Sequence, residues 1–462
     1  MTNKTIKDAI DSRLESVKYS PTNLIYANDK FAKRPTNTVH FKRIACIAAA
    51  CCVMFTFSVG VMAASIPQLN SLFTLVGERI ANMVQPIVQE STSSDIRMNV
   101  LAAMNDDDAV VIYLTLQDLK GAHIDATTEL YDMDISGIVF PQTEIINYDA
   151  ASRMVTMRVT GTCGEKLNGQ KISIKLNTIL AGKNQQYNKD TGYTVADIVK
   201  NRDAKELFYP PDISEYSGNE FYSEMSKTIE QKKYPVLKPD VDAIQISAAP
   251  WTYISAIGMI DDTLRIQQNP NNDMGRYNKL DFSLADENGV ILNDLPRGSV
   301  SFGSVEEHGI YRYVDFEEQA FKLPENADLS KIKLLASTTS YAEKISGEWK
   351  TSFVLNSITE QKSAECIINM NPWEITSISV SPIGVTVKGH GKMYDYSETP
   401  EIVVRRLDGS IIEFSSNSVS VASSDNKENS EEIITYKNAF SIPVDIAEIS
   451  CVSINGVDIP VK

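Results

Sequence analysis

The chain has 462 residues, 43% of them hydrophobic and 23% charged, which predicts about three globular units at roughly 150 residues each and excludes a wholly disordered chain. Residues 1–43 carry nine Lys and Arg against four Asp and Glu, a balance of +5, and residues 44–64 carry no charge, so the net charge of −16 leaves −21 for the remainder. This acidic remainder argues against nucleic acid as its partner, because nucleic-acid binding needs a basic face.

The basic segment at residues 1–43 contains one helical pattern. Thr5 to Asp8 resembles a capping box. The apolar residues that follow form one stripe of a helix, at Ile6, Ala9, Ile10, Leu14 and Val17. Two interpretations stay open: the stripe lies in a groove of a cytosolic partner protein, or the helix rests on the inner membrane surface beside its basic neighbours. The segment has one histidine and no cysteine, which excludes a zinc-binding tip.

Residues 44–64 predict a transmembrane helix. A helix of these 21 residues is roughly 30 Å long at about 1.5 Å per residue, enough to cross the hydrocarbon of a bilayer. Four basic residues lie just before it, and the first basic residue after it is Arg79. By the positive-inside rule, the N-terminus is cytoplasmic and the C-terminal domains are extracellular. A cleaved signal peptide is the alternative, but a preceding segment of 43 residues is too long for one.

Residues 65–94 predict a juxtamembrane helix and a linker. The helical face consists of Leu69, Leu72, Phe73, Val76, Ile80 and Met83. The pattern stops at Pro86 and at the Ser and Thr residues of 91–94. We expect the apolar face to dock on the first domain.

From residue 95 onward the apolar period is two, and three landmarks recur. Hairpin patterns lie at 95–116, 250–267 and 372–389, and the last two contain Pro-Trp pairs 122 residues apart. Asn288-Gly289 and Asp408-Gly409 each separate two alternating runs, with a spacing of 120 residues. Finally, 323–336 resembles 442–454.

These repeats predict a mainly β chain of tandem immunoglobulin-like β-sandwich domains after the transmembrane helix and the short juxtamembrane helix. The predicted boundaries are 95–245, 246–365 and 366–462. The first domain includes an aromatic-rich insert at 181–245. Its aromatic side chains either form a binding surface for glycan or peptide or fix the insert to the sandwich, and we favour the second.

No residue pattern supports catalysis, a metal or a cofactor. The histidines are scattered and form neither a zinc site nor a triad; they are His40, His123, His308 and His390. Asp106 to Asp108 and Asp261-Asp262 fall at repeat turns and are interpreted as solvated turn residues rather than calcium ligands, and 269–275 as a further turn. Trp251 and Trp373 are expected to anchor domain cores. Three cysteines outside the span are interpreted as small buried hydrophobes: Cys163, Cys366 and Cys451.

The order of a basic tip, a span, the sequence IPQLNSLFTLVGERI and the hairpin DIRMNVLAAMNDDDAVVIYLTLQD resembles the domain-of-unknown-function 4179 family of Gram-positive membrane-anchored proteins. The likeness covers roughly residues 40–140. It implies an anti-sigma-factor-like protein or envelope sensor, with a tip that holds a sigma factor and an ectodomain that responds to an unknown envelope ligand. The alternative is a non-catalytic cell-surface structural or adhesive protein.

Overall fold

The computed structural model describes residues 67–462 apart from 164–165, 201–206, 211–212, 219–226, 232, 240–243, 271–276, 304, 308–309, 313–315, 372, 392–398 and 424–431. The predicted span at 44–64 and the predicted contact stripe of the tip lie outside these residues. Within the described part, no helix has both the length and the apolar character needed to cross a membrane.

The described chain begins with two short helices, α3 (Pro67–Val76) and α4 (Glu78–Met83). Gly77 separates them, with a φ of +86°, a left-handed conformation that glycine adopts without steric cost. The predicted single helix is therefore two, here called the helix pair. The predicted linker is also wrong, because its second half is strand β1 (Gln85–Ser93). Pro86 is tolerated in β1 because this strand is a sheet edge and bulges between Pro86 and Gln89.

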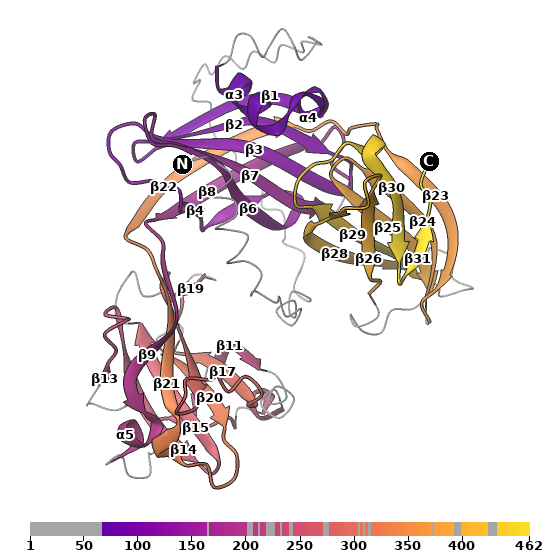
Figure 1. The fold of residues 1–462 in the computed structure, drawn as a ribbon. Helices are drawn as coiled ribbons and strands as arrows, with labels where there is room; N and C mark the ends of the chain where they lie inside the picture. The colour runs from indigo at the N-terminus through magenta and orange to yellow at the C-terminus, as the bar shows by residue number, and fades with distance from the viewer. Residues whose placement is uncertain are drawn as a thin grey trace, which may run out of the picture. The chain divides into compact units, whose positions relative to one another are not determined.

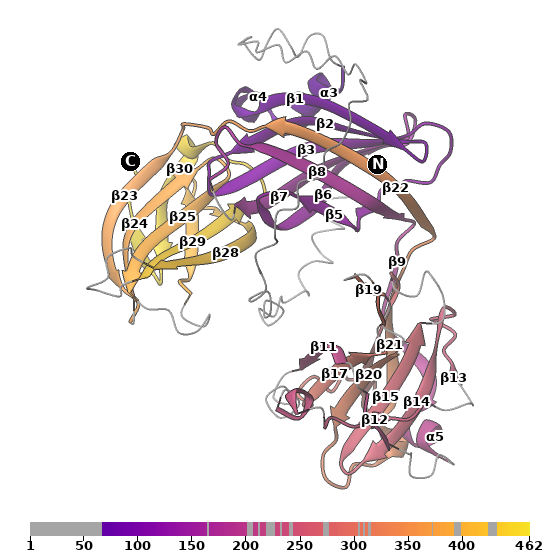
Figure 2. The ribbon, with the colours of Figure 1, turned by 180° about the vertical axis from the view of Figure 1, so that it is seen from behind.

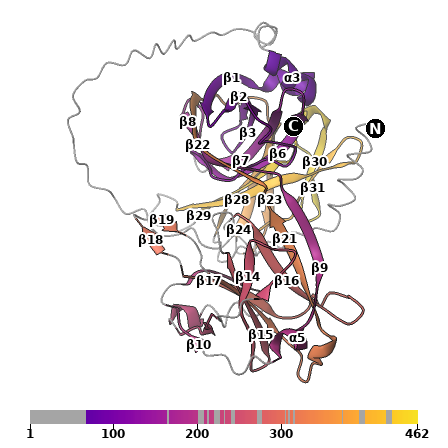
Figure 3. The same ribbon diagram turned by 90° about the vertical axis from the view of Figure 1, so that its left-hand side faces the viewer.

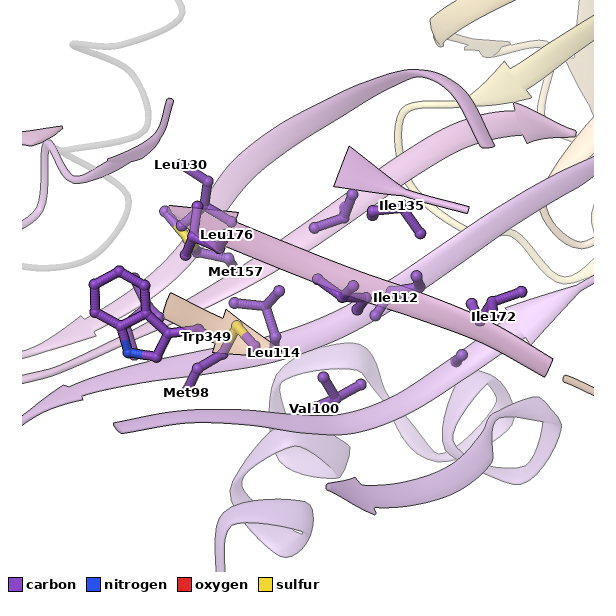
Figure 4. Close-up of a cluster of buried hydrophobic side chains, with 14 of the residues drawn as sticks. Met98, Val100, Ile112, Leu114, Leu130, Ile135, Met157, Ile172, Leu176 and Trp349 are labelled. Atoms are coloured by element: carbon purple, nitrogen blue, oxygen red, sulfur yellow. The ribbon is translucent and has the colours of Figure 1, made fainter. Parts of the chain in front are cut away.

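The first domain is a sandwich of two antiparallel sheets (Figure 1). One sheet has the order β1-β2-β3-β7-β6, with β2 Ile96–Asn105, β3 Ala109–Asp118, β7 Met154–Cys163 and β6 Ile138–Asp149. The other has the order β22-β8-β4 with β5 also on β8, where β22 is Glu343–Val354, β8 Lys171–Ala181, β4 Glu129–Leu130 and β5 Met133–Ile135. Side chains of both sheets fill one core, and Figure 4 shows Met98, Ile112 and Met157 near Ile172, Leu176 and Trp349.

The second domain is inserted into the first. Strand β8 continues at residue 184 into β9 (Asn184–Thr194), and β21 (Lys333–Ser340) leads at residue 343 back into β22. Strands β9 and β21 pair with each other and lie side by side in Figure 3. Strand β22 then pairs with β8 from Lys171↔Val354 to Glu343↔Ala181.

This topology corrects two predicted boundaries. Residues 343–354 were expected in the second domain but complete the second sheet of the first domain, next to β8. Residues 184–245 were expected as an insert of the first domain, but β9, β11 and β13 of this segment pair with strands of the second domain. An alternating run shows that a segment is a strand, but it does not show which distant strand is its partner. The domain boundaries were predicted from the spacing of the repeats alone, and both segments were therefore assigned to the wrong domain.

The second domain spans 184–340 and also has two main sheets. The larger has the order β11-β17-β20-β15-β14-β13, with β11 Ile213–Gly218, β17 Arg297–Phe302, β20 Phe316–Lys322, β15 Thr263–Pro270, β14 Thr252–Ile260 and β13 Ile244–Gln245. The smaller has the order β16-β21-β9, where β16 is Lys279–Ala285. The described part of this domain also contains two strand pairs and three helical turns: β10 Leu207–Phe208 with β12 Val236–Leu237, β18 Val305–Glu307 with β19 Ile310–Arg312, α5 Val195–Val199, residues 227–230 and η2 Leu329–Lys331. Phe282 and Leu334 of the smaller sheet pack on Leu264 and Phe321 of the larger one.

The third domain spans 362–462 and is seen well in Figure 2. Its first sheet has the order β23-β24-β25-β29-β28, with β23 Lys362–Asn369, β24 Trp373–Ser381, β25 Gly384–Gly391, β29 Glu432–Phe440 and β28 Phe414–Ser423. Its second has the order β27-β26-β30-β31, with β27 Ile411–Ile412, β26 Ile402–Arg406, β30 Ile449–Ile454 and β31 Val457–Ile459, and η4 Ile446–Glu448 precedes β30. Trp373 is buried between the sheets, which confirms the predicted core anchor.

The predicted repeat landmarks have equivalent structures in the second and third domains. The hairpins β14–β15 and β24–β25 form where the sequence places them. Gly289 and Gly409 both have a φ of +84° in their turns. Asp328 and Asp445 each accept a backbone hydrogen bond at the start of η2 and η4. The mainly β fold and the internal repeat are therefore confirmed.

Candidate functional site

The helix pair is buried against two domains at once. Leu69, Leu72, Ile80 and Val84 share one cluster with side chains from β2 and β3 of the first domain and with Ile383 and Ala439 of the third domain. The members from β2 and β3 are Leu101, Ala102, Met104, Ala109, Val111 and Tyr113. We call this cluster the junction. The predicted docking on the first domain is confirmed, whereas the contact with the third domain was not predicted.

The sequence of β2 and β3 explains why the junction forms there. Most residues of both strands are buried, including successive residues such as Val110 and Val111. Val110 faces the core of the sandwich, and Val111 faces the junction. A strand that is covered on both faces needs a continuous apolar run rather than an alternating one. The helix pair and the third domain supply the second cover.

Polar contacts extend the junction along the β2–β3 turn. Asp106 accepts hydrogen bonds from the backbone N–H groups of Asp108 (2.9 Å) and Ala109 (2.6 Å) in its own turn. Its Oδ2 accepts a hydrogen bond from the Ser381 hydroxyl of the third domain. The Oγ of Ser381 in turn accepts from the N–H groups of Ile383 (3.1 Å) and Gly384 (3.2 Å). Asp106 therefore connects the turn of one domain to the β24–β25 turn of another.

The neighbouring aspartates also bond across the domains. Asp108 Oδ2 accepts from the Thr386 hydroxyl at 2.8 Å, and its Oδ1 lies 3.3 Å from Lys437 Nζ. The same Nζ donates to the carbonyl oxygen of Cys163 at 2.8 Å. Asp107 Oδ1 accepts a hydrogen bond from the Ser357 hydroxyl at 2.7 Å. Ser357 lies in the segment that connects β22 of the first domain to β23 of the third. The prediction of a turn is confirmed. Its aspartates stay partly exposed, as turn residues do, but they also bond to other segments of the chain, which was not predicted.

Burial changes the chemistry of this turn. It raises the pKa of Asp106 from 3.8 to about 6, and nearby Asp108 adds to the rise, while the hydrogen bonds from Ser381 and the turn oppose it. Burial also raises the pKa of the Cys163 thiol well above its usual range, so the thiol is a packed hydrophobe rather than a nucleophile. Arg79 of α4 forms an ion pair with Asp445 of the third domain.

Other residues singled out by their sequence lie elsewhere. Asp261 and Asp262 occupy the β14–β15 turn, and Asp262 lies 3.6 Å from Lys322 with both side chains about half exposed. Trp251 packs on the core of the second domain, as expected. Tyr187 is 68% exposed on β9, whereas Tyr234 is buried, so the aromatic residues of 181–245 do not share one role. Across the described residues, no group of His, Cys, Asp and Glu is arranged to hold a metal ion.

Comparison with known proteins adds little to this geometry. No protein family matches the chain. No curated protein is similar to it. Among solved structures, a conserved domain protein from Bacillus anthracis aligns over 78% of this chain and 92% of its own length, at 9% identity and a TM-score of 0.17. A likeness this low supports no conclusion on fold or function, so the contacts of the junction carry the functional argument.

Proposed function

We propose that the protein is a single-pass membrane regulator that couples an extracytoplasmic array of immunoglobulin-like sandwiches to a partner in the cytoplasm. In this proposal residues 44–64 span the bilayer, the N-terminus is cytoplasmic, and the protein acts as an envelope sensor of the anti-sigma-factor type. It is not an enzyme and needs no cofactor. The cytoplasmic contact is the stripe Ile6, Ala9, Ile10, Leu14 and Val17.

One observation carries the proposal: the helix pair is held jointly by the first and third domains. Only residues 65 and 66 lie between the proposed span and the start of α3 at Pro67. A change in the contact between the domains therefore alters what holds the chain next to the bilayer. A protein that used its N-terminal segment only as an anchor would have no need to bury that segment against two domains.

The test is capture of cytosolic proteins with residues 1–43 as bait. A second bait carries Ile10→Asp and Leu14→Asp, which place two charges on the apolar stripe. A matched control carries Ser12→Asp and Ser16→Asp, which add the same charge on the side of the predicted helix that faces away from Ile10 and Leu14. We expect a sigma factor to be enriched by the unchanged bait and by the control, but not by the stripe variant. Enrichment of no sigma factor over the stripe variant would sink the regulator proposal.

A further inference from the structure

The connection between the second domain and the helix pair passes through the first domain. Among the described residues, the junction contains side chains of the helix pair, the first domain and the third domain together with Ile358, and none from 184–340. The second domain joins its host where β8 leads into β9 and where β21 leads into β22. A change in the second domain therefore enters the first domain at β8 and β22.

Strand β22 meets β1 without a backbone ladder between them. The backbone of β1 pairs with β2, and the backbone of β22 pairs with β8. Across the gap, Ser91 Oγ accepts a hydrogen bond from the N–H group of Lys350, and Ser93 Oγ accepts one from the N–H group of Glu348, each at 3.0 Å. Side chains of β1 thus satisfy the edge of β22 that faces away from β8.

The local sequence of β22 fits this contact. The Ser94 hydroxyl donates a hydrogen bond to the Ser346 carbonyl at 2.6 Å. Residue 347 is glycine, and a Cβ there would lie 2.8 Å from the Oγ of Ser93. The ladder of β22 with β8 also bulges between Ser346 and Trp349. A bulge and a glycine are features that let two backbones approach each other closely.

Gln85 makes the corresponding contact at the other end of β22. Its Oε1 accepts a hydrogen bond from the N–H group of Asn356 at 2.9 Å, and its Nε2 donates to the Val354 carbonyl at 2.8 Å. Gln85 is the first residue of β1 and directly follows Val84, which is buried in the junction. Gln85 therefore joins the end of the helix pair to the end of β22. We call the five hydrogen bonds of Gln85, Ser91, Ser93 and Ser94 with 346–356 the seam.

The seam is a weaker connection than the ladder beside it. Its hydrogen bonds lie at the surface, where water can replace each of them at little cost in free energy. The ladder of β22 with β8 runs from Lys171↔Val354 to Glu343↔Ala181 and covers buried side chains such as Trp349. A displacement of β22 therefore takes β8 with it and changes the seam first.

We propose that β22 carries changes in the second domain across the seam to β1 and the helix pair, so that the second domain is the input domain of the sensor. The route from the second domain to the helix pair belongs to the described part of the chain. Its onward effect on a cytoplasmic partner rests on the proposed function.

Hydrogen exchange read by mass spectrometry on the full chain in detergent micelles tests the route. Phe282→Ala removes a side chain that is 2% exposed in the core of the second domain, and it loosens that domain without altering a residue of the first. We expect opening at peptides from 343–356 and from 67–83 to increase by about fivefold or more. Peptides from 154–163, on β7, should keep their protection.

A seam variant shows whether this effect crosses the seam. Gln85→Ala removes both hydrogen bonds to the end of β22. Measured against Gln85→Ala alone, the double variant with Phe282→Ala should show the increase at 343–350 but not at 67–83.

The matched control is Gln117→Ala. Gln117 also donates a side-chain hydrogen bond to a backbone carbonyl, that of Ser152 at 3.2 Å, but outside the seam. In this background Phe282→Ala should act on 67–83 as it does in the unchanged chain. If Gln85→Ala reduces protection at 154–163, the pair Ser91→Ala and Ser93→Ala makes the same test from the other end of the seam.

The route is overturned if Phe282→Ala leaves exchange at 67–83 unchanged, or if its full effect at 67–83 persists when the seam is weakened. A failed sigma-factor capture would overturn the proposed function and leave these exchange measurements as they are.

Discussion

Replacement of Trp349 by alanine tests the inserted topology directly. Trp349 lies on β22, is 1% exposed, and packs in the core of the first domain, while its Nε1 donates to the Ile96 carbonyl at 2.8 Å. Loss of a buried tryptophan leaves a cavity that costs about 3–5 kcal/mol. The unpaired Ile96 carbonyl adds about 1 kcal/mol. We therefore expect the first domain to lose about 4–6 kcal/mol of unfolding free energy.

The assay is pulse-labelling hydrogen exchange along a urea series, read separately for peptides of each domain. In Trp349→Ala, peptides from β2 and β8 should become unprotected at lower urea, and those from β14 and β15 should not. The matched control is Phe282→Ala, at a side chain 2% exposed in the second-domain core, which should reverse the pattern. If Trp349→Ala weakens β14 and β15 while β8 keeps its midpoint, the pairing of β22 with β8 is refuted.

Further substitutions probe the cores of the second and third domains. Glu318→Ala should destabilise the second domain by about 3–5 kcal/mol because the buried Arg265, 3.1 Å from the Glu318 carboxylate, loses its partner. Glu318→Leu with Arg265→Met should recover most of that loss in the same urea assay, and an equal loss in both would contradict the ion-pair explanation. Gly389→Ala should lower the melting temperature of the third domain sharply, because the added Cβ would lie 2.1 Å from the backbone oxygen of Glu374. Gly409→Ala meets open space but has a φ of +84°, so calorimetry should show a smaller loss of about 1–2 kcal/mol there.

Local patterns in the sequence predicted the local structure well. The apolar stripe after the predicted span docks on the first domain, and the recurring hairpins form where turn residues separate alternating runs. These features depend on neighbours within about twenty residues, where helical and strand periods are visible.

Long-range partners were not predictable in the same way. The alternating run of β22 is equally compatible with either domain, and only its pairing with β8 decides between them. The acidic composition of the turn at 105–108 indicated contact with solvent. The partners that its aspartates bond were not predictable, because Ser381, Thr386 and Lys437 lie more than 250 residues later in the chain. One signal of the contact with the third domain was available, namely the uninterrupted apolar run of β3. A strand with one face in solvent would alternate apolar and polar residues, so this run indicates that both faces are covered. Gly77 was the corresponding signal for the break between α3 and α4.

The inserted topology also sets an order of folding. The first pair of the β8–β22 ladder joins Lys171 to Val354, so the first domain cannot close until the whole second domain has emerged. Pairing of β9 with β21 brings the ends of β8 and β22 together and removes most of the loop-closure entropy from the later step. A second domain that is already folded therefore brings the two strands of its host together, so the first domain closes faster than it would across an unfolded loop. A variant that slows the second domain alone should delay maturation of the first, although no side chain in the core of the first has changed.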